Sequence, residues 1–275
     1  MNNLVTRTIS GIVFLAVIIA SLLWRAEAFG LVFLFITLTM MTEYIRISVK
    51  KIRCIPYLLT LLCGAALFTV SFCVFGYEAD TRWFLSVIIV LILIITSTLI
   101  GHDSDYYRIL PFLMTPILYI AVPFSLCCIA VFDNGDFNAL PLLAILIMLW
   151  CSDVGAYVFG MTLRRFFSKK LCPSISPKKT VIGYIGSLVS SLTAGYILSE
   201  TGMLQCSILH ALIISFIVNV TGTIGDLAES QFKRHFDVKD SGRIMPGHGG
   251  LLDRFDGALL AFPASISYIL ISNCL

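Results

Sequence analysis

Charge is scarce in this sequence. Only 13% of its 275 residues are Asp, Glu, Lys or Arg, whereas 58% are hydrophobic. The mean hydropathy of +0.95 lies far outside the range of a soluble globular domain. The composition therefore excludes an ordinary water-soluble domain and indicates an integral membrane protein.

Paired cysteines are missing as well. The nine cysteines lie mostly inside apolar runs, with no CxxC pair and no Cys/His cluster of zinc spacing, so we interpret them as small core residues. The sequence also contains no soluble second domain, low-complexity linker or tandem repeat. The net charge of +3 is modest, and the basic residues gather in the loops predicted to face the cytoplasm, where anionic lipid headgroups lie, so lipid is a better expected partner than nucleic acid.

Apolar runs long enough to cross a bilayer recur along the chain. A spanning helix needs about 20 mostly apolar residues. Such runs lie near residues 8–24, 28–43, 56–76, 83–101, 110–132, 139–160, 181–198, 207–229 and 257–273. We therefore predict an all-α, polytopic membrane protein with about nine transmembrane helices, of which the second is the shortest. The first span is expected to be a retained anchor and not a signal peptide.

The distribution of basic residues predicts the orientation, because positively charged loops stay in the cytoplasm. With the N-terminus inside, 17 of the 19 Lys and Arg residues fall in cytoplasmic segments, and only Arg25 and Arg82 fall outside. This tally favours a cytoplasmic N-terminus and an external C-terminus. The loops 161–180 and 230–256 then face the cytoplasm, and the short loops favour a bacterial inner membrane.

Polar groups divide the chain into two regions. Residues 1–140 hold few polar groups in their spans, so we expect a scaffold that provides packing or an oligomer contact, such as a homodimer. Residues 141–275 carry the chemistry. Within them, Gly225 to Asp256 holds eleven charged side chains beside glycine turns.

The end of the span at 207–229 continues as a helix, since no proline stops it. Asp226, Ser230 and Lys233 would then lie on one stripe, with Glu229 beside them. One interpretation is an ion pair between a carboxylate and Lys233 at a helix end. The other is a divalent metal held by Asp226 and Glu229, with Lys233 and Arg234 kept for phosphate.

The segment PGHGG at 246–250 follows this helix. Its glycines allow positive φ and a close approach of the backbone to an anion. Asp253 and Asp256 come next, where the last span begins, and a helix N-cap accounts for one of them but not for both. Together with Asp226 and Glu229, they could hold two Mg²⁺ ions whose shells a nucleotide phosphate completes.

Taken in order, these residues resemble a family signature. The matching positions are Ser230, Lys233, Arg234, Lys239, Asp240, Pro246, His248, Gly249, Gly250, Leu251, Asp253, Arg254 and Asp256. They are similar to the signature of the phosphatidate cytidylyltransferases, and SDVGAYVFG at 152–160 and SPKKT at 176–180 match two upstream segments of that family. The sequence departs from the family at Val181 and Ile182, where Trp and Glu are usual, and at Gly257, where Ser is common.

The resemblance implies transfer of CMP from CTP to phosphatidic acid, with pyrophosphate as the leaving group. It implies Mg²⁺ at Asp226 and Asp253, with Asp256 and Glu229 as second candidates. The remaining predicted site residues are Lys233, Arg234, Lys239, Asp240, His248 and Arg254 for catalysis, and Ser176, Lys178, Lys179, Ser230, Gly249, Gly250, Asp153 and Tyr157 for substrate binding. The sequence does not separate the two lysines between the phosphatidate headgroup and the triphosphate, and Asp153 could instead be a buried structural carboxylate.

Two other functions use similar groups. A CTP- or ATP-dependent lipid kinase of the polyprenol type would release a nucleoside diphosphate in place of pyrophosphate. An ion or metal transporter would use intramembrane Asp153 and Asp226 as its pathway. It would spread acidic residues through several spans, whereas here they gather at one cytoplasmic rim. The aspartate pattern of the CDP-alcohol phosphatidyltransferases, DGxxAR followed by GxxxDxxxD, is missing from the sequence.

Overall fold

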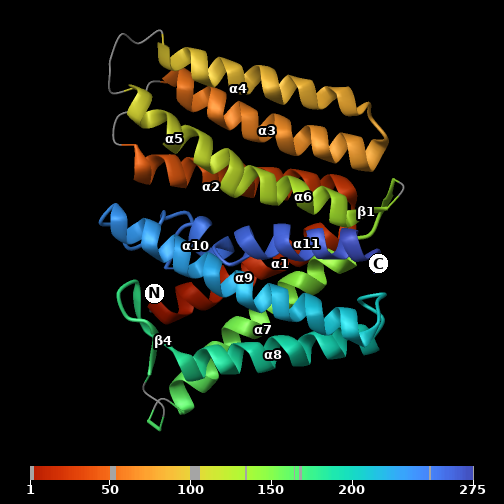
Figure 1. Ribbon diagram of the computed structural model, residues 1–275, viewed down its shortest axis with the longest axis vertical. Coiled ribbons are helices and arrows are strands. Elements are labelled where there is room, and N and C mark those ends of the chain that lie inside the picture. The colour runs from red at the N-terminus through yellow and green to blue at the C-terminus, as the bar shows by residue number, and fades with distance from the viewer. Residues whose placement is uncertain are drawn as a thin grey trace. The chain divides into compact units, whose positions relative to one another are not determined.

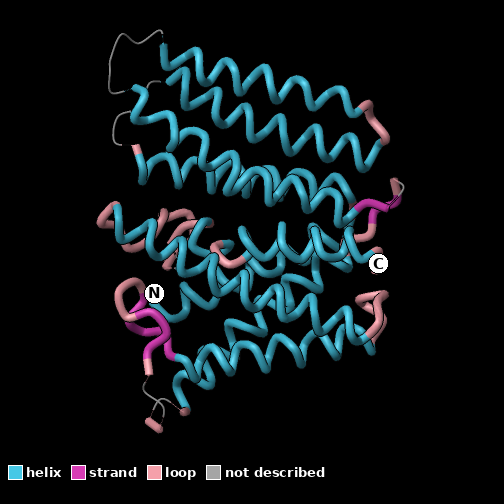
Figure 2. The backbone as a smooth tube through the Cα atoms, viewed as in Figure 1, coloured by secondary structure: helices cyan, strands magenta, loops and turns pink. Residues whose placement is uncertain are grey.

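The computed structural model confirms an all-α membrane protein, with 79% of the residues that it describes in helices. It describes residues 3–49, 54–99, 106–133, 135–163, 165–166, 169–247 and 249–274. Figure 2 shows that the strands are confined to short hairpins between helices. The hairpins are β1 (Phe132–Asp133) with β2 (Asp136–Phe137), and β3 (Lys170–Cys172) with β4 (Ser176–Thr180), both antiparallel.

The helices follow the predicted spans closely (Figure 1). They are α1 (Asn3–Trp24), α2 (Ala26–Ser48), α3 (Cys54–Tyr77), α4 (Phe84–Leu99), α5 (Tyr106–Pro116), α6 (Val122–Val131), α7 (Leu140–Thr162), α8 (Val181–Glu200), α9 (Ile208–His235), α10 (Leu252–Phe255) and α11 (Ala258–Ser272). A 3₁₀ turn, η1 (Thr81–Trp83), precedes α4, and a π-helical turn, η2 (Ile117–Ala121), joins α5 to α6.

Within the described residues, eight helical segments are long and apolar enough to cross a membrane, and the fourth predicted span, near 83–101, corresponds to a shorter apolar stretch, Thr81–Ser97. The expectation that the second span is the shortest is wrong, because α2 has 23 residues. The predicted run, residues 28–43, begins after Glu27 and ends at Glu43, whereas the helix begins before the first carboxylate and continues past the second to Ser48.

The chain forms two packing units. The first comprises Met1–Ala139 and Val238–Arg254, and the second comprises Leu140–Asp237 and Phe255–Leu275. The chain passes from the first unit to the second between Ala139 and Leu140. Residues 238–254, however, pack with the first unit, although the sequence analysis assigned them to the second region.

In the first unit, α2 and α3 pack against each other and against the helices α5 and α6 and the turn η2, while α1 packs on α2 and α4 on α3. Aromatic rings fill the space between these helices. The ring of Phe29 lies 4.5 Å from that of Phe33 and 6.2 Å from that of Phe68, and Phe33 lies 5.7 Å from Phe124, measured between ring centroids. All four side chains are fully buried, so this cluster anchors α2 in its unit.

In the second unit, α7 packs along α8, and α9 packs against α7, α8 and α11. Glycines permit the close approach of α7 and α8, since a Cβ at Gly155 would lie 2.6 Å from the carbonyl oxygen of Gly186. Asn219 of α9 is fully buried and donates to the hydroxyls of Ser152 on α7 and Ser187 on α8, each at 2.9 Å. These bonds hold the three helices in register.

Candidate active site

Helix α9 carries the first group of candidate residues, and it extends past the apolar run to His235 as expected. On its charged end Ser230 Oγ donates to Asp226 Oδ1 at 3.4 Å. Lys233 Nζ forms an ion pair with Glu229 Oε2, and Glu229 is only 1% exposed. The ion-pair interpretation therefore describes Glu229 and Lys233 in this structure, and a metal at Glu229 or a phosphate at Lys233 stays a prediction.

Asp256 joins the same group from the segment between α10 and α11. Its Oδ1 atom accepts a hydrogen bond from the Gly257 N–H at 2.7 Å, and its carboxylate experiences the negative charges of Asp226, Glu229 and Asp153. The structure thus brings together four of the acidic residues that the sequence singled out. A local backbone bond accounts for one oxygen of Asp256, in the manner of a cap, but not for its proximity to the other carboxylates.

Small residues make this proximity achievable. A Cβ at Gly225 of α9 would lie 2.5 Å from the carbonyl oxygen of Asp256, and one at Gly257 would lie 3.2 Å from the carbonyl oxygen of Gly222. The backbone before α11 can therefore contact α9 only because both segments have glycine at the point of contact. The serine that the family commonly has in place of Gly257 would require a small displacement at this contact.

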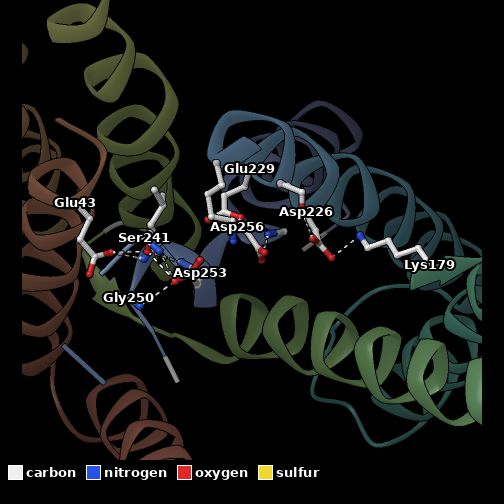
Figure 3. A network of polar contacts seen from close by, with 12 residues as sticks. Glu43, Lys179, Asp226, Glu229, Ser241, Gly250, Asp253 and Asp256 are labelled. Carbon is white, nitrogen blue, oxygen red and sulfur yellow. Dashed lines mark hydrogen bonds and ion pairs between the residues drawn. The ribbon is translucent and has the colours of Figure 1, made fainter. Parts of the chain in front are cut away.

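Lys179 approaches the carboxylates from strand β4. Thr180, at the end of the strand, caps α8 by accepting from the Gly183 N–H, so the strand leads directly into that helix. Lys179 Nζ lies 2.5 Å from Asp226 Oδ2, an ion pair drawn in Figure 3. Its neighbour Lys178 is exposed, because successive residues of a strand point to opposite faces. The two lysines therefore differ in their surroundings, while their division between headgroup and triphosphate stays a prediction.

The other residues of the upstream segments are placed more simply. Asp153 and Tyr157 lie on the exposed face of α7, with Tyr157 67% exposed, so Asp153 is not the buried structural carboxylate that we considered as an alternative. Ser176 begins β4, opposite Cys172 of β3. The predicted loop 161–180 is thus partly a β-hairpin.

The glycine segment 238–254 belongs to the first unit. Gly247 and Gly249 have φ of +79° and +88°, which confirms the expected positive φ, and the Met245 N–H donates to the Gly249 carbonyl to close the turn. Arg234, Lys239, Asp240 and Arg254 are exposed. His248 lies outside the described residues, so its predicted role is untouched by the structure.

The segment surrounds a carboxylate of its own. Asp253 Oδ2 accepts from the Ser241 N–H at 2.8 Å, from the Gly250 N–H at 2.9 Å and from the Ser241 hydroxyl at 3.0 Å (Figure 3). A Cβ at Gly249 would come within 2.6 Å of the same oxygen. The glycines that we predicted to receive an anion therefore admit Asp253, and contact of Gly249 or Gly250 with substrate stays a prediction.

A residue that the sequence analysis did not select also reaches this segment. Glu43 of α2 accepts hydrogen bonds from the Leu251 N–H at 3.1 Å and from the Leu252 N–H at 2.8 Å. The one signal that could have found it is a carboxylate near the end of an apolar span, which is costly unless it has a partner or a function.

The carboxylates of the site suit an open Mg²⁺ site better than a closed one. Among the described residues no group of three or more His, Cys, Asp or Glu side chains has the geometry of a closed metal site. Mg²⁺, however, takes only one or two carboxylates when substrate phosphates and water complete its shell. Figure 3 shows the carboxylates of Asp226 and Asp256 beside each other, so this pair is suited to such an open site.

Comparisons with known proteins are consistent over nearly the whole chain. Residues 5–272 match the model of the cytidylyltransferase family. The chain is 31% identical over 266 residues to the phosphatidate cytidylyltransferase of Bacillus subtilis (strain 168), a match that covers 95% of this chain and 94% of that protein. It is 29% identical over 257 residues to the protein of the same name from Staphylococcus haemolyticus (strain JCSC1435), covering 94% and 95% of the two chains.

Proposed function

Because the chain belongs to the cytidylyltransferase family, we propose that it transfers CMP from CTP to phosphatidic acid, forming CDP-diacylglycerol, the activated precursor for phospholipid synthesis. The structural observation that supports this reaction most directly is the group formed by Asp226, Asp256 and Lys179. It presents carboxylates for a divalent cation beside a basic side chain for phosphate. A membrane-embedded site of this kind suits one lipid substrate and one water-soluble substrate.

In the proposed reaction, an oxygen of the phosphatidic acid phosphate attacks the α-phosphorus of CTP. A new P–O bond forms, and the bond between the α-phosphorus and the oxygen bridging to the β-phosphate breaks, so pyrophosphate leaves with the electron pair. A phosphate monoester loses its second proton with a pKa of about 6 and is therefore mostly ionised at neutral pH. The protein accordingly needs no strong general base, and its work is positioning and charge neutralisation.

The residues divide this work. Asp226 and Asp256 would hold Mg²⁺, while Glu229 and Asp253 stay metal ligands that the sequence predicts. When bound, Mg²⁺ supplies neutralisation of the CTP phosphates. Lys179 offers its ammonium group to the same phosphates, while exposed Arg234, Lys239 and Arg254 attract the triphosphate by charge. Exposed Lys178 is suited to the anionic headgroup of the lipid.

We further propose that the site faces the cytoplasm of a bacterial inner membrane. The basic residues of the cytoplasmic loops and the bacterial relatives support this location. Large apolar side chains exposed along the spans, including Leu31 at 71% and Leu118 at 69%, are suited to contact with lipid tails. A homodimer would use such faces too, and analytical ultracentrifugation in detergent would measure that association.

The proposed function is tested with purified protein in liposomes containing phosphatidic acid. We expect pyrophosphate release to require CTP, the lipid and Mg²⁺, and to stop when EDTA is added. The Asp226→Asn and Asp256→Asn variants should each lower the rate by about 10²-fold or more, because developing charge is then poorly neutralised.

The matched control is Asp136→Asn, which changes an exposed aspartate of strand β2. It should retain the rate of the unchanged protein. Release of CDP in place of pyrophosphate would indicate a kinase and would contradict the proposal.

A further inference from the structure

Helix α2 supplies a buried carboxylate to the glycine segment of the first unit. Glu43 is 6% exposed, and its Oε2 atom accepts from the Leu252 N–H at 2.8 Å and lies 3.1 Å from the Ser241 hydroxyl oxygen, while Oε1 accepts from the Leu251 N–H at 3.1 Å. These partners lie 198 to 209 residues away in the sequence. A side chain in the predicted scaffold therefore contacts the signature segment directly.

The segment is shaped to receive this carboxylate. A Cβ at Gly242 would overlap Glu43 Oε1, and a Cβ at Gly250 would lie 2.5 Å from Glu43 Oε2. Both positions therefore require glycine for the side chain of Glu43 to enter. Leu251 and Leu252 are themselves 4% and 0% exposed, so water cannot replace Glu43 as the acceptor for their N–H groups.

Glu43 is linked to Asp253 in two ways. Ser241 Oγ lies within hydrogen-bonding distance of both carboxylates, 3.1 Å from Glu43 Oε2 and 3.0 Å from Asp253 Oδ2. The backbone provides the second link, because Gly250 donates to Asp253 and the next two residues donate to Glu43 (Figure 3). Displacement of Glu43 would therefore change the position of the Asp253 carboxylate.

We propose that Glu43 is a positioning residue for the reaction, which holds the segment 238–254 and with it the carboxylate of Asp253 in the arrangement that CTP binding requires. This inference rests on the proposed function. Both oxygens of Glu43 face donors, so the two acceptor sites of a carboxylate are required. Glutamine has the same shape but would place an NH₂ group against an N–H or O–H group, and it cannot replace glutamate here.

The first test measures steady-state pyrophosphate release by Glu43→Gln while CTP and phosphatidic acid are varied in turn. We expect kcat/KM for CTP to fall about 10- to 100-fold, the effect of leaving buried donors unsatisfied, with little change in the KM for phosphatidic acid. Glu27→Gln is the matched control on the same helix. Its exposed carboxylate accepts one bond, from Tyr77, which a glutamine oxygen can also accept, so its kinetics should be unchanged.

Ser241→Ala is a second, milder variant that leaves α2 intact. We expect Ser241→Ala to lower kcat/KM for CTP as well, but by a smaller factor than Glu43→Gln. Combined with Glu43→Gln, its effect should be less than the product of the two, because both changes remove the same hydrogen bond. An equal rise in the KM values for CTP and for phosphatidic acid would contradict the positioning role.

The second test does not depend on activity. Lys239 and Arg243 are exposed trypsin sites in the segment, and we expect cleavage there to be faster in Glu43→Gln than in the unchanged protein or in Glu27→Gln. Unchanged cleavage would overturn the inference whatever the enzymatic result. If Glu43→Gln is cleaved faster but the unchanged protein itself releases no pyrophosphate, anchoring by Glu43 is supported and the proposed function is overturned instead.

Discussion

Lys179 of strand β4 and Asp226 of helix α9 form an ion pair whose Nζ and Oδ2 atoms lie 2.5 Å apart. The two residues are far apart in the sequence and lie on different elements of the second unit. Their contact joins the segment SPKKT to the acidic group on α9 and places a basic side chain where phosphate and metal would meet.

This pair predicts unequal roles for the two neighbouring lysines. Lys179→Ala should lower kcat/KM for CTP about tenfold or more, since it removes a charged partner of both Asp226 and phosphate. Lys178→Ala should act mainly by raising the KM for phosphatidic acid, because that side chain is exposed on the other face of the strand. Pyrophosphate release by the two variants at varied concentrations of each substrate measures this difference. Identical kinetic profiles would contradict it.

The ion pair between Lys233 and Glu229 predicts an effect on stability. The side chain of Glu229 is 1% exposed and that of Lys233 is 14% exposed. Lys233→Met would leave a buried charge without its compensating ammonium group and should reduce the free energy of unfolding by about 3–5 kcal/mol. Thermal unfolding in detergent would show this loss, and the double variant Lys233→Met with Glu229→Leu should recover much of it.

Arg234→Met is the control for that measurement, because Arg234 is exposed on the same turn of α9. Its unfolding temperature should change little. A similar decrease in both single variants would show that the Lys233–Glu229 pair is not responsible.

The contact between α9 and the segment before α11 predicts a requirement for glycine at position 225. Gly225→Ala would place a Cβ 2.5 Å from the carbonyl oxygen of Asp256, and such overpacking costs about 1–3 kcal/mol. We expect both a lower unfolding temperature and lower activity, because Asp256 would move away from Asp226.

Gly160→Ala provides the matched helical control for this change. Its Cβ would meet no atom closer than 3.7 Å, and alanine favours helix by about 1 kcal/mol over glycine. This variant should be at least as stable as the unchanged protein. Equal destabilisation of Gly160→Ala and Gly225→Ala would argue against the packing explanation.

Much of the fold could be predicted because it follows from local chemistry. Apolar runs predicted the helices, and the lack of proline after residue 207 predicted the extension of α9 through Asp226 and Lys233. The positive φ of Gly247 and Gly249 followed from their place in a glycine-rich turn. Each of these features is determined within a few residues of the chain.

The missed features depend on contacts between distant segments. Glu43 was overlooked because its partners lie about two hundred residues further along, and no periodicity records such a contact. The different exposure of Lys178 and Lys179 depends on the pairing of β4 with β3. The sequence analysis predicted a loop for residues 161–180 and therefore no such pairing. The requirement for glycine at position 225 depends on the backbone of Asp256, which lies against it in the fold but not next to it in the sequence.

The central claim is that the α-phosphorus of CTP is transferred to phosphatidic acid. It is tested most directly by incubating the purified protein, Mg²⁺ and phosphatidic acid liposomes with CTP that carries ³²P at either the α or the γ position. We predict that the α label enters the lipid and that the γ label leaves as pyrophosphate, with both events lost in Asp226→Asn. Transfer of the γ label to the lipid, or no lipid labelling from either position by the folded protein, would contradict the account.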